Sequence, residues 1–186
     1  MSGTESLLDL IKAFDAASIP YMIVGSYSSN YYGIPRLTKN ADLVVHLPSE
    51  KWGSLNDILP QGLDWEDQSS FELVTTTRRE LLRVRGSLFQ IELFRLSEDP
   101  HDQSRFARRR KVEIFPGREI FLPTPEDVIV QKLRWNLRAM RPKDFEDAVA
   151  VIQVQENSLD WDYMAGWTAM HGTSHLFEMA KARAAG

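Results

Sequence analysis

The sequence contains no cysteine and no long uninterrupted run of apolar residues. The first absence excludes disulfides, thiolate metal sites and cysteine nucleophiles. The second excludes a membrane-spanning helix, which needs about 20 consecutive apolar residues. Near the N-terminus, Glu5, Asp9 and Asp15 interrupt the apolar residues, which favours an amphipathic helix over a signal peptide. We therefore expect a soluble, cytoplasmic protein with no membrane partner.

Several catalytic signatures are missing as well. The sequence has neither the Gly-x-Ser-x-Gly motif of hydrolases nor a P-loop. His171 and His175 are spaced like two zinc ligands on one helix, but Gly172 lies between them and no third ligand is evident. Serine-hydrolase, P-loop and zinc chemistry therefore find no support.

The composition is that of an ordinary globular domain, with 186 residues, 43% hydrophobic and 26% charged. The net charge of −4 is unevenly placed. Residues 76–145 hold 16 of the 22 Lys and Arg but 10 of the 26 Asp and Glu, so this stretch is +6 and the rest is −10. Such a basic middle suggests a phosphate-bearing partner, and we expect it to border the functional cleft. The alternative for the run at 108–111 is a solvated face.

Hydrophobic periodicity and turn residues predict the order of the elements. We expect a helix over 4–18 capped by Thr4, and Thr124 followed by Pro125 predicts another helix start. The other predicted helices cover 27–32, 49–59, weakly 102–110, 142–154, and one or two within 158–184. The predicted strands cover 21–24, 41–46, 71–77, 81–85 and 88–94, with a hairpin over 111–122. This order indicates an α+β fold: an α/β core at 1–122 and a helical C-terminal portion at 123–186 packed on it, as one structural unit.

Polar residues at the ends of two predicted strands form a candidate site. Gly25 ends a strand and lets the backbone approach a ligand closely, and Ser26 is expected to cap a helix whose first amides favour a phosphate. Residues 40 and 42 point to one face of the next strand. Asp42 and Glu92 could supply the oxygen ligands of a divalent cation, and we expect them to converge if 41–45 lies beside 21–24 and near 88–94.

Each of these residues also has a purely structural interpretation. Asp42 could cap a loop at the strand end, and Asn40 could be a turn residue. Glu92 could pair with Arg83 or Arg85 across the sheet.

Residues 25–45 resemble the signature of the DNA polymerase β-like nucleotidyltransferase superfamily, especially its small bacterial branch that includes AbiEii-type toxins. The matching residues are Gly25-Ser26, then Gly33-x-Pro35-Arg36-x-Thr38-Lys39, then Asn40-x-Asp42 followed by apolar residues. A third family carboxylate, on a later strand, matches Glu92. The stretch from Leu122 to Asp147 more loosely resembles the helical portion of that branch, so that the resemblance covers most of residues 20–150.

The resemblance implies a nucleotidyltransferase-like mixed β-sheet with flanking helices. It implies an Mg²⁺-dependent (or Mn²⁺-dependent) transfer of a nucleoside monophosphate from an NTP to a hydroxyl of RNA, a protein or a small molecule. Asp42 and Glu92 would be catalytic and, with Asn40, would hold the metal. Gly25 and Ser26 would hold the phosphates, aided by Lys132. The alternative for Lys132 is an exposed helix lysine, and Trp135, Trp161 and Trp167 are expected to pack the helical layer.

One residue departs from the family pattern. Asn40 replaces the first carboxylate of Asp-x-Asp, and an amide oxygen brings no negative charge to a metal. Because two-metal phosphoryl transfer depends on that charge, a second hypothesis stays open. In it the protein is a catalytically degenerate nucleotide- or RNA-binding protein, or an interaction protein of the toxin–antitoxin type.

Overall fold

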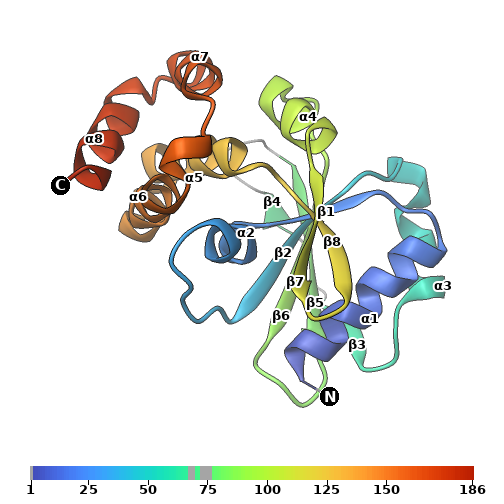
Figure 1. Ribbon diagram of the computed structural model, residues 1–186. Coiled ribbons are helices and arrows are strands. Elements are labelled where there is room, and N and C mark those ends of the chain that lie inside the picture. Colours follow the sequence, from blue (N-terminus) through green and yellow to red (C-terminus); the bar gives the residue numbers. More distant parts are fainter. Residues whose placement is uncertain (1, 67–69, 72–76) are drawn as a thin grey trace.

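The structure, a computed structural model, describes residues 2–66, 70–71 and 77–186. A mixed sheet forms its centre, and helix α2 lies between this sheet and the C-terminal helices α5 to α8 (Figure 1). The fold is α+β, as predicted. Of the predicted strand at 71–77, residues 72–76 lie outside the described residues.

The sheet has the order β1-β2-β6-β5-β3, with β4 also paired to β5. These strands are β1 (Tyr21–Val24), β2 (Asn40–Val45), β3 (Leu63–Trp65), β4 (Ser70–Phe71), β5 (Arg78–Val84) and β6 (Gln90–Arg95). β2 and β6 run parallel, and the other pairs are antiparallel. The predicted neighbourhood of 41–45 with 21–24 and 88–94 is therefore confirmed.

Helix α1 (Gly3–Ala16) covers part of the sheet with its buried Leu7, Leu10 and Phe14. Its cap is Ser2, which forms a capping box with Glu5, so the prediction that Thr4 caps this helix was wrong. The capping box fixes the start because both Ser2 and Glu5 satisfy first-turn amides, which Thr4 alone could not do. The predicted helix over 49–59 divides into the 3-10 helix η1 (Ser49–Ser54) and the short α3 (Leu55–Ile58).

The second half of the chain follows the predicted pattern closely. After α4 (Pro100–Ala107), the expected hairpin forms from β7 (Arg110–Phe115) and β8 (Arg118–Leu122). Thr124 caps α5 (Pro125–Ala139) through the amide of Asp127, as predicted. The remaining helices are α6 (Pro142–Gln155), the short η2 (Glu156–Ser158), α7 (Trp161–His171) and α8 (Ser174–Ala184). Gly172 ends α7 in the left-handed region, so His171 and His175 lie on different helices.

A buried polar cluster fixes α4 against α5 and α7. The carboxylate of Asp127 accepts hydrogen bonds from Thr124 Oγ1 at 2.9 Å and Tyr163 Oη at 2.5 Å. His101 Nε2 of α4 lies 3.3 Å from the same carboxylate, and both side chains are fully buried. Breaking such a cluster would leave a charge buried without partners, so it holds α4 firmly in place.

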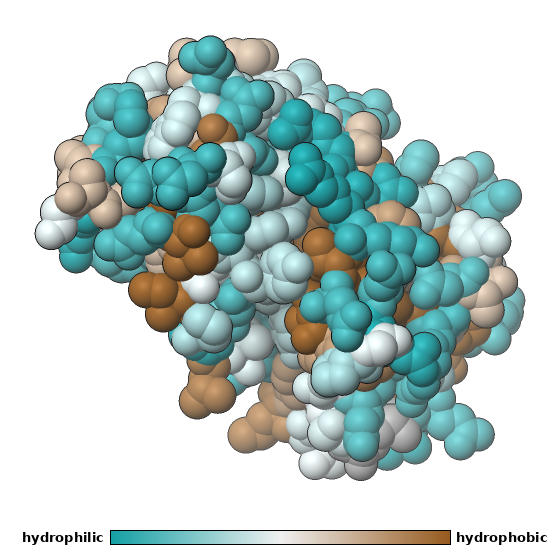
Figure 2. Space-filling model, in the orientation of Figure 1, coloured by the Kyte–Doolittle hydropathy of each residue, from teal (hydrophilic) through white to brown (hydrophobic). Residues whose placement is uncertain are grey.

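The core is continuous from α1 to α8, and the division at residue 122 stays a prediction. Figure 2 shows a largely hydrophilic face with small apolar patches. Within the described part of the chain, no helix is both long and apolar enough to cross a bilayer.

Candidate active site

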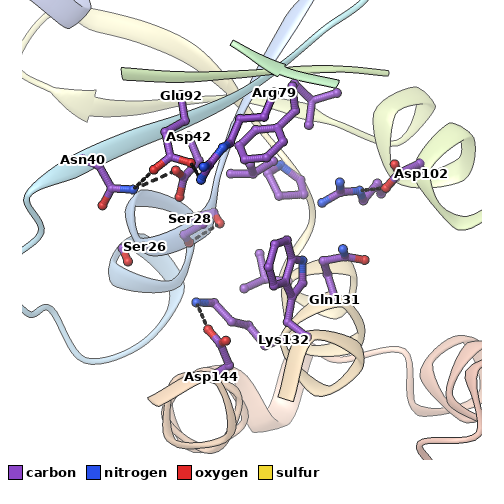
Figure 3. A pocket seen from close by; sticks show the side chains of 18 of the residues that line it. Ser26, Ser28, Asn40, Asp42, Arg79, Glu92, Asp102, Gln131, Lys132 and Asp144 are labelled. Atoms are coloured by element: carbon purple, nitrogen blue, oxygen red, sulfur yellow. Dashed lines mark hydrogen bonds and ion pairs between the residues drawn. The ribbon is translucent and has the colours of Figure 1, made fainter. Parts of the chain in front are cut away.

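The parallel pairing of β2 and β6 sets Asp42 opposite Glu92. The side-chain amide of Asn40 donates from one nitrogen to Asp42 Oδ1 at 3.0 Å and to Glu92 Oε1 at 3.1 Å (Figure 3). The two carboxylates thus share one face of the sheet and point toward one donor. Their predicted convergence is confirmed.

Glu92 has a second partner on the neighbouring strand. Its Oε2 accepts a hydrogen bond from Arg79 Nη1 at 2.9 Å. The expectation that Arg83 or Arg85 would be this partner was wrong, because these arginines pair with Glu66 and Asp64 on the other side of β5. Arg79 lies diagonally from Glu92, within reach of a long side chain.

Within the described residues, Asp42 forms no ion pair of the kind that Arg79 makes with Glu92. Burial and, next, the Glu92 carboxylate raise the pKa of Asp42 to about 7, while the more distant Lys132, Lys143 and Arg141 act in the opposite direction. Two carboxylates this close repel each other, and an added cation would relieve that repulsion.

Gly25 places the start of α2 directly against this carboxylate pair. Its φ of +64° lies in the left-handed region, and a Cβ there would come within 2.0 Å of Asp42 Oδ2. Glycine takes this conformation freely, and α2 begins at Gly25 with Val24 in the cap position. Ser26 therefore lies in the first turn, and the prediction that it caps the helix was wrong.

The hydroxyl of Ser26 is positioned by the arginine of the Gly-x-Pro-Arg motif. Arg36 Nη2 donates to Ser26 Oγ at 3.1 Å. A hydroxyl can donate while it accepts, and among the described residues this one donates to no protein acceptor, so its hydrogen can be donated to an anion in the cavity.

A buried ion network joins this turn to the helical portion. Asp147 accepts from Arg36 at 2.9 and 2.8 Å and from Lys132 Nζ at 2.7 Å. Lys132 also contacts Asp144 at 2.9 Å. Although burial acts to raise it, the hydrogen bonds from Arg36 and Lys132 lower the pKa of Asp147. Lys132 is only 8% exposed, so the alternative of an exposed helix lysine was wrong.

These groups border a cavity of about 570 Å³ between the sheet, α2, α4, α5 and the start of α6. Its size falls in the range of small-molecule sites. Among the described residues, six basic and four acidic side chains line it: Arg79, Arg95, Arg105, Lys132, Arg141 and Lys143, with Asp42, Glu92, Asp102 and Asp144. Part of the basic middle thus borders the cleft, as expected, whereas the run at 108–111 does not.

The residues present fit a divalent cation. Asp42 and Glu92 each turn an oxygen toward one point, and rotating the Asn40 amide by half a turn would present its carbonyl there. Carboxylate and amide oxygens are ligands that Mg²⁺ and Mn²⁺ accept. Among the described residues no group of three Asp, Glu or His side chains gathers as a metal site, so only two charged ligands are available.

Sequence reasoning missed several residues of the cavity. Arg105 and Asp102 on α4, and Gln131 on α5, line it, and so does Trp135, which was expected to pack between helices. Val128, Gln131, Lys132 and Trp135 recur at three- and four-residue spacing, so they share one face of α5. That spacing was the available signal, but it is equally typical of a core-facing helix.

No protein-family model and no curated protein matches the sequence. The structure is similar to the solution structure of the antibiotic-resistance factor ANT(2'')-Ia, with a TM-score of 0.61 and 16% identity over 98% of this chain and 99% of that one. The crystal structure of ANT(2'')-Ia in complex with adenylyl-2''-tobramycin gives a TM-score of 0.62 and 15% identity, over 92% and 99%. An antigenic nucleotidyltransferase-like protein from Paracoccidioides brasiliensis gives 0.58 and 19%, over 95% and 92%. The fold is therefore that of the nucleotidyltransferases, while the AbiEii-type branch stays a prediction.

Alanine substitutions at two glycines, one of them Gly25, test the contact between Gly25 and Asp42. Gly25→Ala and Gly117→Ala both place a Cβ at a positive φ, but the added Cβ at Gly117 meets nothing within 4 Å. Both variants should lose about 1–2 kcal/mol for the left-handed backbone. Gly25→Ala should lose about 1–3 kcal/mol more, because Asp42 must be displaced. Urea unfolding measures both, and equal losses would contradict the close contact.

The pKa of Asp42 predicts a pH-dependent stability without metal. Between the ordinary value of 3.8 and about 7, the folded protein holds a proton that the unfolded chain releases. The free energy of unfolding contributed by this group therefore falls as pH rises through that window. Asp42→Asn keeps an acceptor for Asn40 but cannot ionise, so at pH 8 it should be more stable than the native protein by about 2–4 kcal/mol.

Urea unfolding in EDTA from pH 4.5 to pH 8 measures this difference, which should shrink toward the acid end. Asp57→Asn, the same change at an exposed site, is the control. If the difference in unfolding free energy between the native and Asp42→Asn proteins stays constant across this range, the pKa of Asp42 is not raised in the folded protein.

Proposed function

We propose that this protein transfers a nucleoside monophosphate from an NTP to a hydroxyl group of an acceptor, with Mg²⁺ or Mn²⁺. The observation that supports the proposal is the contact of the Gly25 turn with Asp42 of the Asp42–Glu92 pair, since the first amides of α2, which favour an anion, then lie beside two convergent carboxylates. Two solved structures of ANT(2'')-Ia share the fold, and one of them contains adenylyl-2''-tobramycin.

The residues of the cavity suit the parts of this reaction. The acceptor oxygen would bond to the α-phosphorus of the NTP, the bond from that phosphorus to the β-phosphate oxygen would break, and pyrophosphate would leave. Asp42 and Glu92, with the Asn40 carbonyl, would hold the cation, which neutralises phosphate charge and polarises the reacting centre. A carboxylate of this pair would receive the hydroxyl proton.

The chain's own donors would hold the leaving phosphates. The first amides of α2, from Gly25 and Ser26 onward, have no partner within the helix and favour an anion. The Ser26 hydroxyl, already held by Arg36, would donate to a phosphate oxygen. Lys132 forms ion pairs with Asp144 and Asp147, which neutralise its charge. It would therefore contribute to phosphate binding as part of the cavity wall more than as an unpaired positive charge.

One observation favours a second function, that of a silent nucleotide-binding protein. The Asn40 amide occupies the point toward which both carboxylates turn, so the protein supplies its own donor where active relatives would need a cation. A protein that keeps this arrangement would bind a nucleotide or a partner without turnover.

Metal titration of three proteins separates the two functions. With NTP present, Mn²⁺ should bind the native protein and should bind Asn40→Asp about tenfold more tightly, because one more negative charge faces the cation. Asp42→Asn should lose most of the binding. Transfer from NTP labelled at the α-phosphate should follow the same order.

Calorimetry and a labelled-product assay give these two readouts, and the exposed Asp57→Asn is the matched control. Equal metal binding in all three proteins, or none in any, would rule out a metal site at residues 40 and 42. Metal-independent NTP binding with no labelled product would establish the silent function instead.

A further inference from the structure

The cavity extends beyond the carboxylates to a wall formed by α4. Figure 3 shows Asp102, on α4, across the cavity from Asn40 and Ser26, with Gln131 on the Asp102 side and Lys132 on the Ser26 side. The groups assigned above to phosphate and metal all lie toward the Ser26 side. The α4 side therefore needs a separate explanation.

Arg105 is held rigidly at this wall. Its Nε donates to Asp102 Oδ1 at 2.7 Å, and Asp102 Oδ2 accepts from Ser97 Oγ at 2.5 Å. The Arg105 side chain is 8% exposed. Within the described ranges its two terminal nitrogens make no hydrogen bond, although they belong to a side chain that lines the cavity. A buried guanidinium with free donors is suited to bind a carboxylate or phosphate.

Gln131 offers the complementary group. It is 8% exposed, and its Oε1 is buried with no hydrogen-bond partner among the described residues. Buried hydrogen-bond acceptors normally have a partner. An acceptor without one, on a side chain that lines a cavity, is therefore suited to a hydrogen-bond donor of a ligand.

The cavity also has apolar and further basic side chains in its lining. Val44, Phe94, Pro123 and Val128 line the cavity and would cover a carbon skeleton. Arg95 also lines the cavity, with its guanidinium 4.5 Å from the centre of the Trp52 ring and Nη2 3.4 Å from Glu80 Oε1. Because Arg105 already pairs with Asp102, that carboxylate is unsuited to bind a polycationic acceptor.

We propose that the α4 side of the cavity binds the acceptor, and that this acceptor is a small hydroxyl compound carrying a carboxylate or phosphate group. Its anionic group accepts from the terminal nitrogens of Arg105, and a hydroxyl of its skeleton donates to Gln131 Oε1. A second hydroxyl then faces Asp42 and Glu92. This inference rests on the proposed function for the transfer step, while the anion-binding site itself does not.

The burial of Arg105 and Gln131 favours a small acceptor over a polymer. A ligand must enter the cavity to reach either group, whereas the phosphates of an RNA chain follow exposed basic residues. The exposed Arg141 and Lys143 at the rim suit such a chain better than Arg105 does.

Three probes with one carbon skeleton test the proposal: D-glycerate, glycerol 3-phosphate and glycerol. NMR titration of the native full chain, without NTP or metal, follows the Arg105 Nε–H and Gln131 side-chain amide signals. We expect saturable shifts of both signals with at least one anionic probe and none with glycerol. The two anionic probes distinguish a carboxylate acceptor from a phosphate acceptor.

Gln131→Glu is the principal variant, because it keeps the side-chain shape and adds a charge that repels the anion. It should weaken binding of the anionic probe by about tenfold or more. Arg105→Lys, which keeps a cation beside Asp102, should also weaken binding. Arg138→Ala removes a positive charge from the exposed face of α5 and should leave binding unchanged.

The proposal is overturned if glycerol shifts these signals as much as the anions, or if the anions shift only signals around Gly25 and Ser26. It is also overturned if Arg138→Ala weakens binding as much as Gln131→Glu, or if only a short RNA oligonucleotide moves the two signals. Because no NTP is present, failure here leaves the metal and transfer measurements standing, and their failure leaves the anion site standing.

Discussion

The whole site depends on two like charges being held close together. Asp42 and Glu92 lie side by side because β2 and β6 pair in parallel register, and the Asn40 amide binds both. Arg79 neutralises the far side of Glu92, while Asp42 faces Gly25 with no room for a side chain between them. Such a pair is unfavourable alone, because each charge loses water and repels the other. Its place at the start of α2 would suit the cation and phosphates of the proposed function.

A second charged network keeps this pair facing the helical portion. Arg36, from the loop before β2, and Lys132, from α5, both bind Asp147 of α6. The loop with the sequence Gly-x-Pro-Arg is thereby tied to α5 and α6, which form the opposite wall of the cavity. The His101–Asp127 contact ties α4 to α5 in the same manner. Polar contacts of definite geometry therefore join the elements that form the walls of the cavity.

Local patterns predicted much of the fold and the centre of the site. Alternation in β2 and β6 was sufficient to place Asp42 and Glu92 on one face, and Thr124 marked the start of α5. Ser26 was misplaced by one residue because α2 starts after Val24, which makes no side-chain cap hydrogen bond that the sequence could have marked. The burial of Lys132 depends on Asp144 and Asp147, which are 12 and 15 residues away along the chain. Arg105 of α4 and Gln131 of α5 line the same cavity because α4 packs near α5. No local sequence pattern encodes that packing.

The central claim is that the carboxylate pair is a cation site serving a bound triphosphate. Anomalous diffraction from crystals grown with Mn²⁺ and a non-hydrolysable NTP analogue tests it most directly. The account predicts a manganese peak between Asp42 and Glu92, the Asn40 amide turned to present its oxygen, and the triphosphate against the first turn of α2. A triphosphate bound elsewhere, or a pair that keeps both hydrogen bonds to Asn40 with no manganese beside it, would contradict the account.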